Sequence, residues 1–426
     1  MADTLAARRA VLQALHAVLH KRRPLDEALT GDLDGRDRAF AYLLVTTVLR
    51  RLGQIDAVID GMVERRLPRS AMAVRDILRL GIGQLLFLET PAHAAVDTAV
   101  SLVADRGLDR FAGLVNAVLR RVARDRETLL DGQDAARLNT PDWLWEDWMT
   151  AYGETRTRAV AEAHMLEPTL DLTVKGDAKL WAQRLEASLL PTGTLRLPVG
   201  GSVTDLPGFD AGAWWVQDAG AALAAPLLGD VEGARVLDLC AAPGGKTAQL
   251  AAAGAKVTAI DRSARRLDRV RENLARLRLE ADCEVADGSV YEAEAPYDAV
   301  LLDAPCSSTG TIRRHPDVAR NKTQEDVAKL AALQQRLLDN AVSLVRPGGL
   351  IVYSTCSLQP EEGERQIARL LGNGAPVERL PIDPSEVGGL SEIINDLGEV
   401  RSLPCHAADW GGLDGFHIAR LRRTGA

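Results

Sequence analysis

The chain has 426 residues and a net charge of −8, and 46% of its residues are hydrophobic and 26% charged. This length exceeds one ordinary domain, and the composition is typical of a soluble globular protein, so we expect two or three domains. The sequence contains no run of 18 apolar residues, and charges interrupt its first apolar stretch. Neither a membrane span nor a signal peptide is therefore expected.

The charge is unevenly distributed along the chain. Residues 1–126 hold 20 Lys and Arg against 15 Asp and Glu, a net charge of +5, whereas the remainder has a net charge of −13. A basic module is compatible with an RNA partner, because phosphate contacts dominate such binding. Arginines that simply solvate helix faces would give the same numbers.

The metal-binding and redox residues are sparse. The chain has five cysteines, an odd number, and no two of them form a CxxC motif. They are Cys240, Cys283, Cys306, Cys356 and Cys405. This spacing argues against disulfides and zinc, and it favours the reducing cytoplasm. His16 and His20 are four residues apart, but no third ligand is evident. We therefore expect no metal site.

The pattern of apolar residues divides the chain into three parts. Residues 1–126 show helical spacing throughout, which predicts an all-α domain. Residues 127–215 contain a tryptophan cluster, "TPDWLWEDWMTAYG", and are rich in Pro and Gly. We expect a linker or small α+β subdomain here, whose tryptophans dock one domain on another rather than stack on bases.

Residues 216–426 alternate short β-rich runs with helical patterns. The predicted strands are Val236–Leu239, Val257–Ile260, Cys283–Val285, Ala299–Leu302 and Leu350–Ser354. This alternation predicts an α/β, Rossmann-like domain with a mostly parallel, doubly wound sheet. Ligands of such sheets bind beyond the carboxyl ends of the strands, and the conspicuous motifs follow strands here.

The first of these motifs is "VLDLCAAPGGKT", a strand followed by a glycine turn. A phosphate loop would need a glycine where Cys240 stands, and Pro243 removes an N–H that a phosphate cradle would use. Asp261 ends the next strand, where an acid can accept hydrogen bonds from ribose hydroxyls. These features favour S-adenosylmethionine, a cofactor that carries an adenosine but no pyrophosphate. An ATPase, in which "VLLD" would be the magnesium-binding strand, remains an alternative.

Two cysteines follow neighbouring predicted strands. Asp303 and Cys306 come after the fourth strand, and Cys356 comes after the fifth. Methylation of cytosine at C5 requires a thiolate that adds to C6, a carboxyl group at N3 and loss of the C5 proton. These residues could meet at one sheet edge, but their spacing alone does not say which cysteine attacks.

The motifs "LDLCAAPGGKT", "LLDAPCSSTGTIRRHPD", "YSTCSLQPEEGE" and "DGFHIARL" occur in this order. Together they resemble the bacterial cytosine-5 RNA methyltransferases of the Sun/Fmu (RsmB-like) type, which act on 16S ribosomal RNA. The stretches "PAHAAVDTAVSLV" and "LVNAVLRRV" in residues 1–126 resemble the RNA-binding NusB fold that precedes the catalytic domain in this subfamily. The resemblance implies a class I S-adenosylmethionine-dependent domain over 216–426.

The resemblance also implies residue roles. The residues that would line the methionine and adenosine parts of the cofactor are Cys240, Ala241, Ala242, Pro243, Gly244, Gly245 and Lys246. Asp261 would hold the ribose, Asp287 would lie by the adenine, and Asp303 would reach both cofactor and base. Cys356 would be the nucleophile and Cys306 would assist product release, whereas DNA cytosine methyltransferases attack with the Pro-Cys cysteine.

The remaining expectations concern partners. Arg313, Arg314 and His315 of "TIRRHPD" could meet RNA phosphates or form a solvated loop. We expect a cytoplasmic monomer whose substrate is naked 16S RNA or a partly assembled small subunit. A non-catalytic RNA-binding assembly factor is a second alternative, which the intact set of Asp303, Cys306 and Cys356 disfavours.

Overall fold

The computed structural model describes residues 5–29, 33–63, 67–68, 71–198 and 200–425. The chain forms two units. The first comprises residues 1–166 and 312–322, and the second comprises residues 167–311 and 323–426.

The first unit is helical, as the spacing predicts for residues 1–126, and it continues to residue 166 within the stretch 127–215 that was predicted to be a linker or small α+β subdomain. Its helices are α1 (Ala6–Lys21), α2 (Leu25–Ala28), α3 (Gly35–Arg50), α4 (Leu52–Met62), α5 (Met72–Phe87), α6 (Ala92–Asp105), α7 (Ala112–Asp125), α8 (Ala135–Asn139), α9 (Asp142–His164) and α14 (Val318–Asn321). In α7, Val115, Val118, Leu119 and Val122 are all buried. Their i, i+3, i+4, i+7 spacing places them on one face, which explains why this stretch folds as an amphipathic helix.

The segment Ile312–Lys322 belongs to this helical unit although it lies far along the chain. The Asp317 carboxylate accepts a hydrogen bond from the Leu25 backbone N–H at 3.0 Å. Arg320 donates to the Asn139 carbonyl at 2.7 Å. The unit is therefore discontinuous in sequence.

The second unit contains a small antiparallel sheet and a large one. The small sheet has the order β2-β3-β1-β4 and is accompanied by α10. Its elements are β1 (Leu170–Val174), α10 (Ala178–Arg184), β2 (Ser188–Leu189), β3 (Leu195–Leu197) and β4 (Trp214–Val216). Asp171 and Arg196, both almost fully buried, form a bidentate ion pair at 2.6 and 2.7 Å across this sheet.

The large sheet has the order β10-β12-β9-β8-β5-β6-β7, with β11 paired to β12. Its strands are β5 (Arg235–Leu239), β6 (Lys256–Asp261), β7 (Asp282–Val285), β8 (Tyr297–Asp303), β9 (Val345–Thr355), β10 (Val377–Arg379), β11 (Val400–Arg401) and β12 (His417–Arg423). The pairs from β7 to β9 are parallel, and β12 runs antiparallel to β9. The predicted parallel sheet is confirmed, and the antiparallel edge was not predicted.

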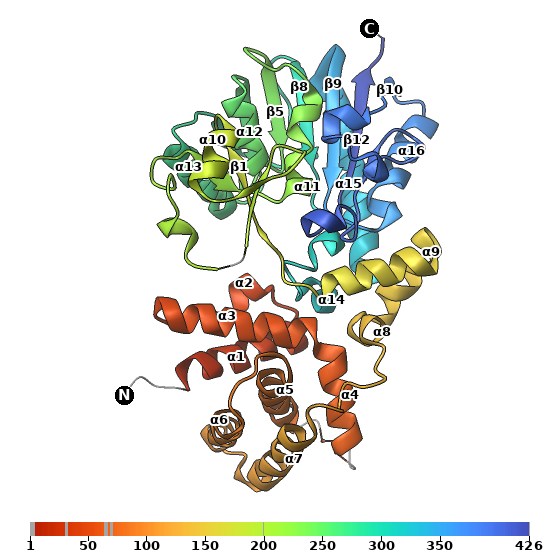
Figure 1. Cartoon of the computed structure of the whole chain (residues 1–426). Coiled ribbons are helices and arrows are strands. Elements are labelled where there is room, and N and C mark those ends of the chain that lie inside the picture. The colour runs from red at the N-terminus through yellow and green to blue at the C-terminus, as the bar shows by residue number, and fades with distance from the viewer. Residues whose placement is uncertain (1–4, 30–32, 64–66, 69–70, 199, 426) are drawn as a thin grey trace. The chain divides into compact units, whose positions relative to one another are not determined.

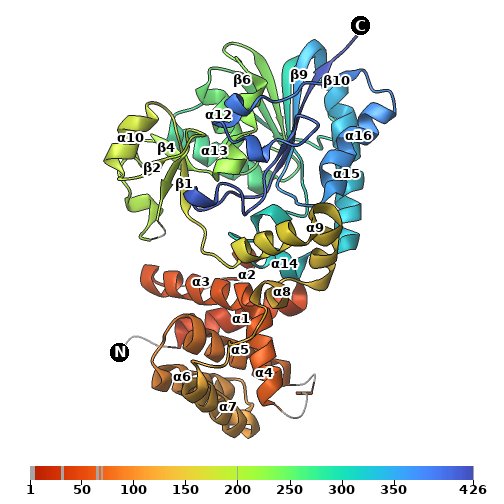
Figure 2. The ribbon, with the colours of Figure 1, turned by 45° about the vertical axis from the view of Figure 1, so that its right-hand side comes forward.

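Helices cover both faces of this sheet. They are α11 (Ala219–Ala222), α12 (Gly245–Ala252), α13 (Ala264–Leu277), α15 (Gln324–Leu344) and α16 (Glu364–Gly372). Figures 1 and 2 both show α15 and α16 side by side. In β8, Leu301 packs into one core and Leu302 into the opposite one. This alternation makes "AVLL" apolar at every position, as a doubly covered strand requires.

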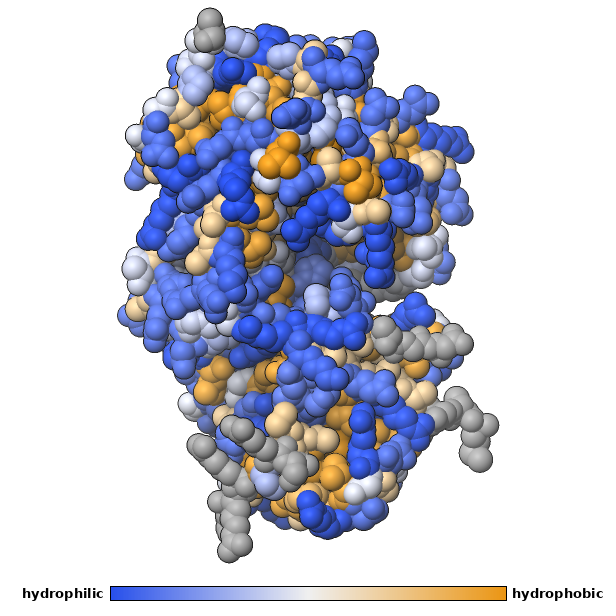
Figure 3. Space-filling view, turned by 180° about the vertical axis from the view of Figure 1, so that it is seen from behind, coloured by the Kyte–Doolittle hydropathy of each residue, from blue (hydrophilic) through white to orange (hydrophobic). Residues whose placement is uncertain are grey.

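Hydrophilic residues cover most of the face drawn in Figure 3, and hydrophobic side chains appear there as separate patches. None of the helices among the described residues is long and apolar enough to cross a membrane.

Candidate active site at the carboxyl edge of the large sheet

The glycine loop leaves β5 in an unusual backbone conformation. Cys240 has a φ of 64° and Gly244 a φ of 100°. At Gly244 a side chain would be strained by this positive φ, and its Cβ would lie 3.1 Å from Val270. The loop then enters α12, where Thr247 donates to the Asp238 carboxylate at 2.5 Å. The glycine is thus needed to bring the backbone close to α13.

A pocket opens beside this loop, at the ends of β5 and β6. Its walls include Cys240, Asp261 and Asp287, three of the predicted cofactor residues. Sequence reasoning missed other lining residues, namely Arg262, Arg266, Gly288, Pro305, Leu333 and Leu337.

The acid at the tip of β6 is suited to hydroxyl groups. Asp261 is 3% exposed, and its Oδ1 accepts the Ser263 backbone N–H at 2.9 Å. Its Oδ2 lies 3.2 Å from Arg266 Nη1, but it accepts no hydrogen bond from any described residue. A buried carboxylate oxygen without a donor is costly, and ribose hydroxyls would supply donors. This observation fits an adenosine-bearing cofactor.

Asp287 follows β7 at the far side of the pocket. Its carboxylate accepts hydrogen bonds from the Ser289 hydroxyl at 2.7 Å and the Ser289 N–H at 2.9 Å, and these bonds lower its pKa. Asp287 therefore closes a turn as well as lining the pocket.

Two groups at the carboxyl end of β5 hold their protons more strongly than usual. Burial raises the pKa of Asp238 to about 7. Burial also raises the pKa of the Cys240 thiol well above its ordinary value. Cys240 is consequently a neutral wall of the pocket at neutral pH rather than a nucleophile.

An ion pair joins the glycine loop to the next strand. Lys246, which is 8% exposed, places its Nζ 2.7 Å from Asp303 Oδ2 at the end of β8. The same ammonium lies 5.3 Å from the centre of the Phe416 ring. Asp303 keeps about a third of its side chain exposed. Its carboxylate is thus oriented on one side and open on the other.

The two candidate cysteines meet at this edge. Cys306 and Cys356 follow the adjacent strands β8 and β9, and their sulfur atoms are 3.4 Å apart. The Gly310 N–H donates to the Cys356 carbonyl at 3.0 Å, which links the two loops. The hydrogen bond to Cys356 and burial raise the pKa of the Cys306 thiol well above its ordinary value.

Other predicted residues lie elsewhere. Cys283 packs in the apolar cluster beneath α13, and Cys405 lies between β11 and β12. Arg313 is 1% exposed within the helical unit, and its carbonyl accepts from Arg50. The suggestion that Arg313 meets RNA phosphates is therefore wrong, because its side chain is buried.

A third ligating group near the histidine pair was also missed. Asp76 lies close to His16 and His20, with the ligand atoms of all three within 4.8 Å of one another. Its carboxylate is paired with His20 at 3.0 Å and with Arg79 at 2.8 Å. These contacts engage both oxygens of the Asp76 carboxylate.

This geometry, in which acids that follow parallel strands line a pocket beside a glycine loop without a pyrophosphate cradle, is that expected of an S-adenosylmethionine-dependent methyltransferase. Residues 225–422 match the family described as 16S rRNA methyltransferase RsmB/F, and residues 5–124 match the NusB family. The chain belongs to the RsmB/F family of S-adenosylmethionine-dependent rRNA methyltransferases. This membership favours the methyltransferase over the ATPase and the non-catalytic alternatives.

Full-length relatives support this assignment. A ribosomal RNA small subunit methyltransferase B of Cronobacter sakazakii is 37% identical over 87% of this chain and 91% of its own. The protein of the same name from Xylella fastidiosa (strain Temecula1) is 37% identical over 99% of both chains. The crystal structure of PH0851 covers 98% of this chain and 99% of its own with a TM-score of 0.78, and at 22% identity it supports the fold.

Proposed function

We propose that the protein methylates C5 of a cytidine in 16S ribosomal RNA through a covalent bond between a cysteine and C6. The observation that carries this proposal is the pair of thiols 3.4 Å apart beside Asp303. C5 of cytosine is a poor nucleophile, and thiolate addition at C6 makes it enamine-like. The bound S-adenosylmethionine supplies the methyl group.

We assign cofactor binding to the pocket at the carboxyl ends of β5, β6 and β7. The loop Cys240–Lys246 would line the cofactor, Asp261 would accept its ribose hydroxyls, and Asp287 would lie by its adenine. The Asp261 oxygen without a hydrogen bond from the described residues supports this assignment. Asp303 would reach both the cofactor and N3 of the base, because Lys246 holds one side of its carboxylate and the other side is exposed.

Cys356 is the proposed nucleophile. It is more exposed than Cys306, which is 9% exposed. The raised pKa of Cys306 makes it the proton-holding partner, whose S–H can stabilise a thiolate at Cys356. The thiolate adds to C6, and a proton shared between Asp303 and N3 neutralises the electrons that this addition displaces onto N3. C5 then accepts the methyl group.

Cys306 is proposed to act in release. Once Cys356 is bonded to carbon, its hydrogen bond and charge no longer raise the pKa of Cys306, although burial still does. Cys306 then passes its proton to solvent, and the resulting thiolate can take the proton from C5. The electrons of that C–H bond re-form the C5–C6 double bond and expel the Cys356 thiolate.

Isotope transfer tests the reaction. The protein is incubated with methyl-labelled S-adenosylmethionine and unmodified small-subunit RNA, and label at C5 of one cytidine is expected. Label on another atom, or no label while the protein is folded, would contradict the proposal.

Cysteine replacement tests the roles. Cys356→Ala should abolish methylation and the covalent RNA adduct, whereas Cys306→Ala should form an adduct that persists through denaturing electrophoresis. Cys283→Ala, in an apolar cluster, is the matched control and should retain both. Loss of the adduct in Cys306→Ala but not in Cys356→Ala would reverse the assignment.

We also propose that the three parts 1–126, 127–215 and 216–426 are functional divisions and that the first binds RNA. The net charge of +5 in residues 1–126 supports this proposal. RNA affinity that does not fall with salt would count against it. A cytoplasmic monomer is the proposed working form, and light scattering of the full chain would reveal any larger assembly.

A further inference from the structure

Glu362 is a buried acid that the reaction scheme above does not use. It ends the short 3₁₀ turn Pro360–Glu362, just before α16, and none of it is exposed. A buried carboxylate is costly unless donors surround it. Its partners therefore indicate what it does.

One set of partners belongs to the Cys306 loop. Glu362 Oε1 accepts the Ser307 backbone N–H at 2.9 Å, and the Ser307 hydroxyl donates to Oε2. Gln334 of α15 donates its amide to Oε1 at 3.0 Å and to the Pro305 carbonyl at 2.9 Å. The residues on both sides of Cys306 are thus tied to this carboxylate directly or through Gln334.

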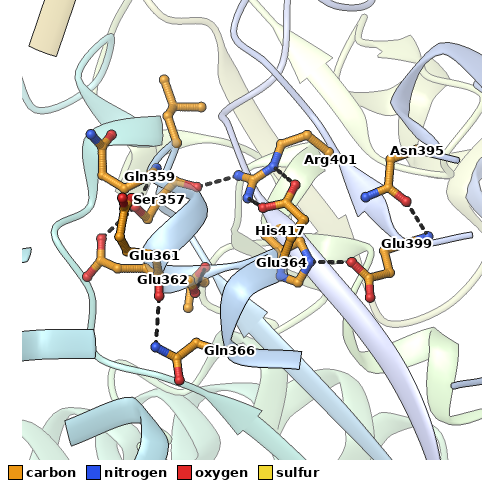
Figure 4. Close-up of polar contacts among 12 residues, drawn as sticks. Ser357, Gln359, Glu361, Glu362, Glu364, Gln366, Asn395, Glu399, Arg401 and His417 are labelled. Atoms are coloured by element: carbon orange, nitrogen blue, oxygen red, sulfur yellow. Dashed lines mark hydrogen bonds and ion pairs between the residues drawn. The ribbon is translucent and has the colours of Figure 1, made fainter. Parts of the chain in front are cut away.

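The other set belongs to the Cys356 loop. The Ser357 hydroxyl donates to Glu362 Oε2 at 2.6 Å. Figure 4 shows Arg401 reaching the Ser357 carbonyl from the opposite side, at 2.5 Å, while it pairs with Glu364. The residue after Cys356 is therefore held through both its side chain and its backbone.

Glu362 is itself fixed to the strand that ends at Cys356. Its backbone carbonyl accepts hydrogen bonds from the Tyr353 hydroxyl at 2.7 Å and from Thr355 Oγ1 at 3.1 Å. Both side chains belong to β9. The carboxylate therefore cannot shift without disturbing the strand.

The chemistry of this cluster explains why a carboxylate stands here. Ser307 N–H and the Gln334 amide can only donate at these atoms, and both serine hydroxyls donate as well. An ionised carboxylate is a side chain that accepts at every lone pair. Burial raises the pKa of Glu362, and the hydrogen bonds from Ser307, Ser357 and Gln334 oppose that rise.

We propose that Glu362 is a positioning residue that joins the two cysteine loops through Ser307 and Ser357 and thereby sets the separation of Cys306 and Cys356. The inference rests on the proposed function in one respect, namely that the fixed separation serves release of the methylated base. The geometric part stands without any RNA.

Disulfide formation measures this separation directly. Diamide takes up two hydrogens from two neighbouring thiols, which become joined as a disulfide. In the full-length native protein we expect a Cys306–Cys356 disulfide, identified by mass spectrometry of peptides. In Glu362→Gln one of the two acceptor oxygens becomes an NH2 group, so either the two serine hydroxyls or the Ser307 N–H and the Gln334 amide lose their acceptor. The loops should then loosen, and the rate of disulfide formation should fall about tenfold because the thiols are less well oriented.

Glu361→Gln is the matched control, because Glu361 is the neighbouring acid and pairs with Arg365 at the surface. It should form the disulfide at the native rate. A second variant, Ser307→Ala with Ser357→Ala, keeps the carboxylate and removes both hydroxyl links, and it should also slow the reaction. It serves as the test if Glu362→Gln does not fold.

An unchanged disulfide rate in a variant that unfolds at the native temperature would overturn the proposal. So would a native protein that forms no such disulfide although Cys356 can be alkylated. These results do not depend on methylation, so a failure of the proposed function would be seen separately in the isotope experiment.

The reaction provides a second readout. Glu362→Gln should lower kcat, leave KM for S-adenosylmethionine unchanged and raise the fraction of folded enzyme trapped as RNA adduct. A residue that only stabilised the fold would reduce activity and adduct together. A parallel loss of both would therefore overturn the proposed role in release.

Discussion

The two halves of the carboxyl edge are built differently. On the side of β5, β6 and β7, the site is shaped by backbone, with positive φ angles at Cys240 and Gly244 and an Asp261 oxygen that accepts no hydrogen bond from the described residues. On the side of β8 and β9, buried side chains bond to one another around Glu362. The first half offers an acceptor to the hydrogen-bond donors of a ligand, whereas the polar side chains of the second half are already paired with one another.

This difference indicates how each half should respond to change. A substitution in the half that lacks donors should weaken binding of the ligand, because the ligand completes the hydrogen bonds there. A substitution in the half whose polar groups are already paired should lower the reaction rate or the stability of the fold, because it leaves other buried groups unpaired.

Replacing Asp303 with Asn should have the largest effect, because this residue joins the two halves through Lys246. Loss of the carboxyl group that we propose at N3 should lower kcat by about 10²–10⁴-fold, the usual range for general acid–base groups. Steady-state methylation assays measure this change. Asp298→Asn, at the opposite end of β8, is the control, and an equal loss there would remove the special role of Asp303.

Replacing Glu364 with Gln tests the self-paired half through stability. Burial alone would raise the pKa of Glu364, but the Arg401 charge and hydrogen bonds outweigh burial and lower it to about 2. Because the folded-state pKa lies below the ordinary value, this stabilisation is complete above about pH 4.5 and is lost as the pH falls toward 2. It amounts to at most about 3 kcal/mol.

Urea unfolding of the native protein and Glu364→Gln from pH 7 to pH 3 measures that contribution. The difference between the two should shrink as the pH falls. Glu325→Gln, whose exposed pair with Lys329 contributes little, is the control. A difference that stays constant with pH would contradict the role of the Arg401 pair.

Replacing Asp261 with Asn should have the smallest of these effects. The amide can accept from only one oxygen, so KM for S-adenosylmethionine should rise about tenfold, the equivalent of one hydrogen bond to a charged group, while kcat changes little. Binding of S-adenosylhomocysteine by calorimetry gives an independent value. Asp268→Asn, at the exposed surface of α13, should leave the affinity unchanged.

Local patterns in the sequence predicted much of this arrangement. The five apolar runs became β5 to β9, and each acid or cysteine placed after a run lies at the same edge of the sheet. Parallel strands share their carboxyl edge, so chain order alone was sufficient for Asp261, Asp303, Cys306 and Cys356 to be placed there.

Other features depend on contacts between distant residues. Glu362 lies among several acids in "PEEGE", and only the fold shows that it faces Ser307, 55 residues earlier. The ring of Phe416, which directly precedes β12, lies 5.3 Å from the Lys246 ammonium, and no local pattern in the sequence indicates this contact. Arg313 was misjudged because it packs into the helical unit, where its carbonyl accepts a hydrogen bond from Arg50, 263 residues earlier.

The membership of Ile312–Lys322 in the helical unit has a consequence for biosynthesis. Proteins emerge from the ribosome N-terminus first, and early domains usually fold as they emerge. Here the helices of residues 5–166 cannot acquire their last helix, α14, until residue 322 has been translated. A truncated chain that ends before this segment would leave Leu25 and Asn139 without their hydrogen-bond partners, Asp317 and Arg320. The N-terminal unit is thus finished late, after the strand that carries Asp303.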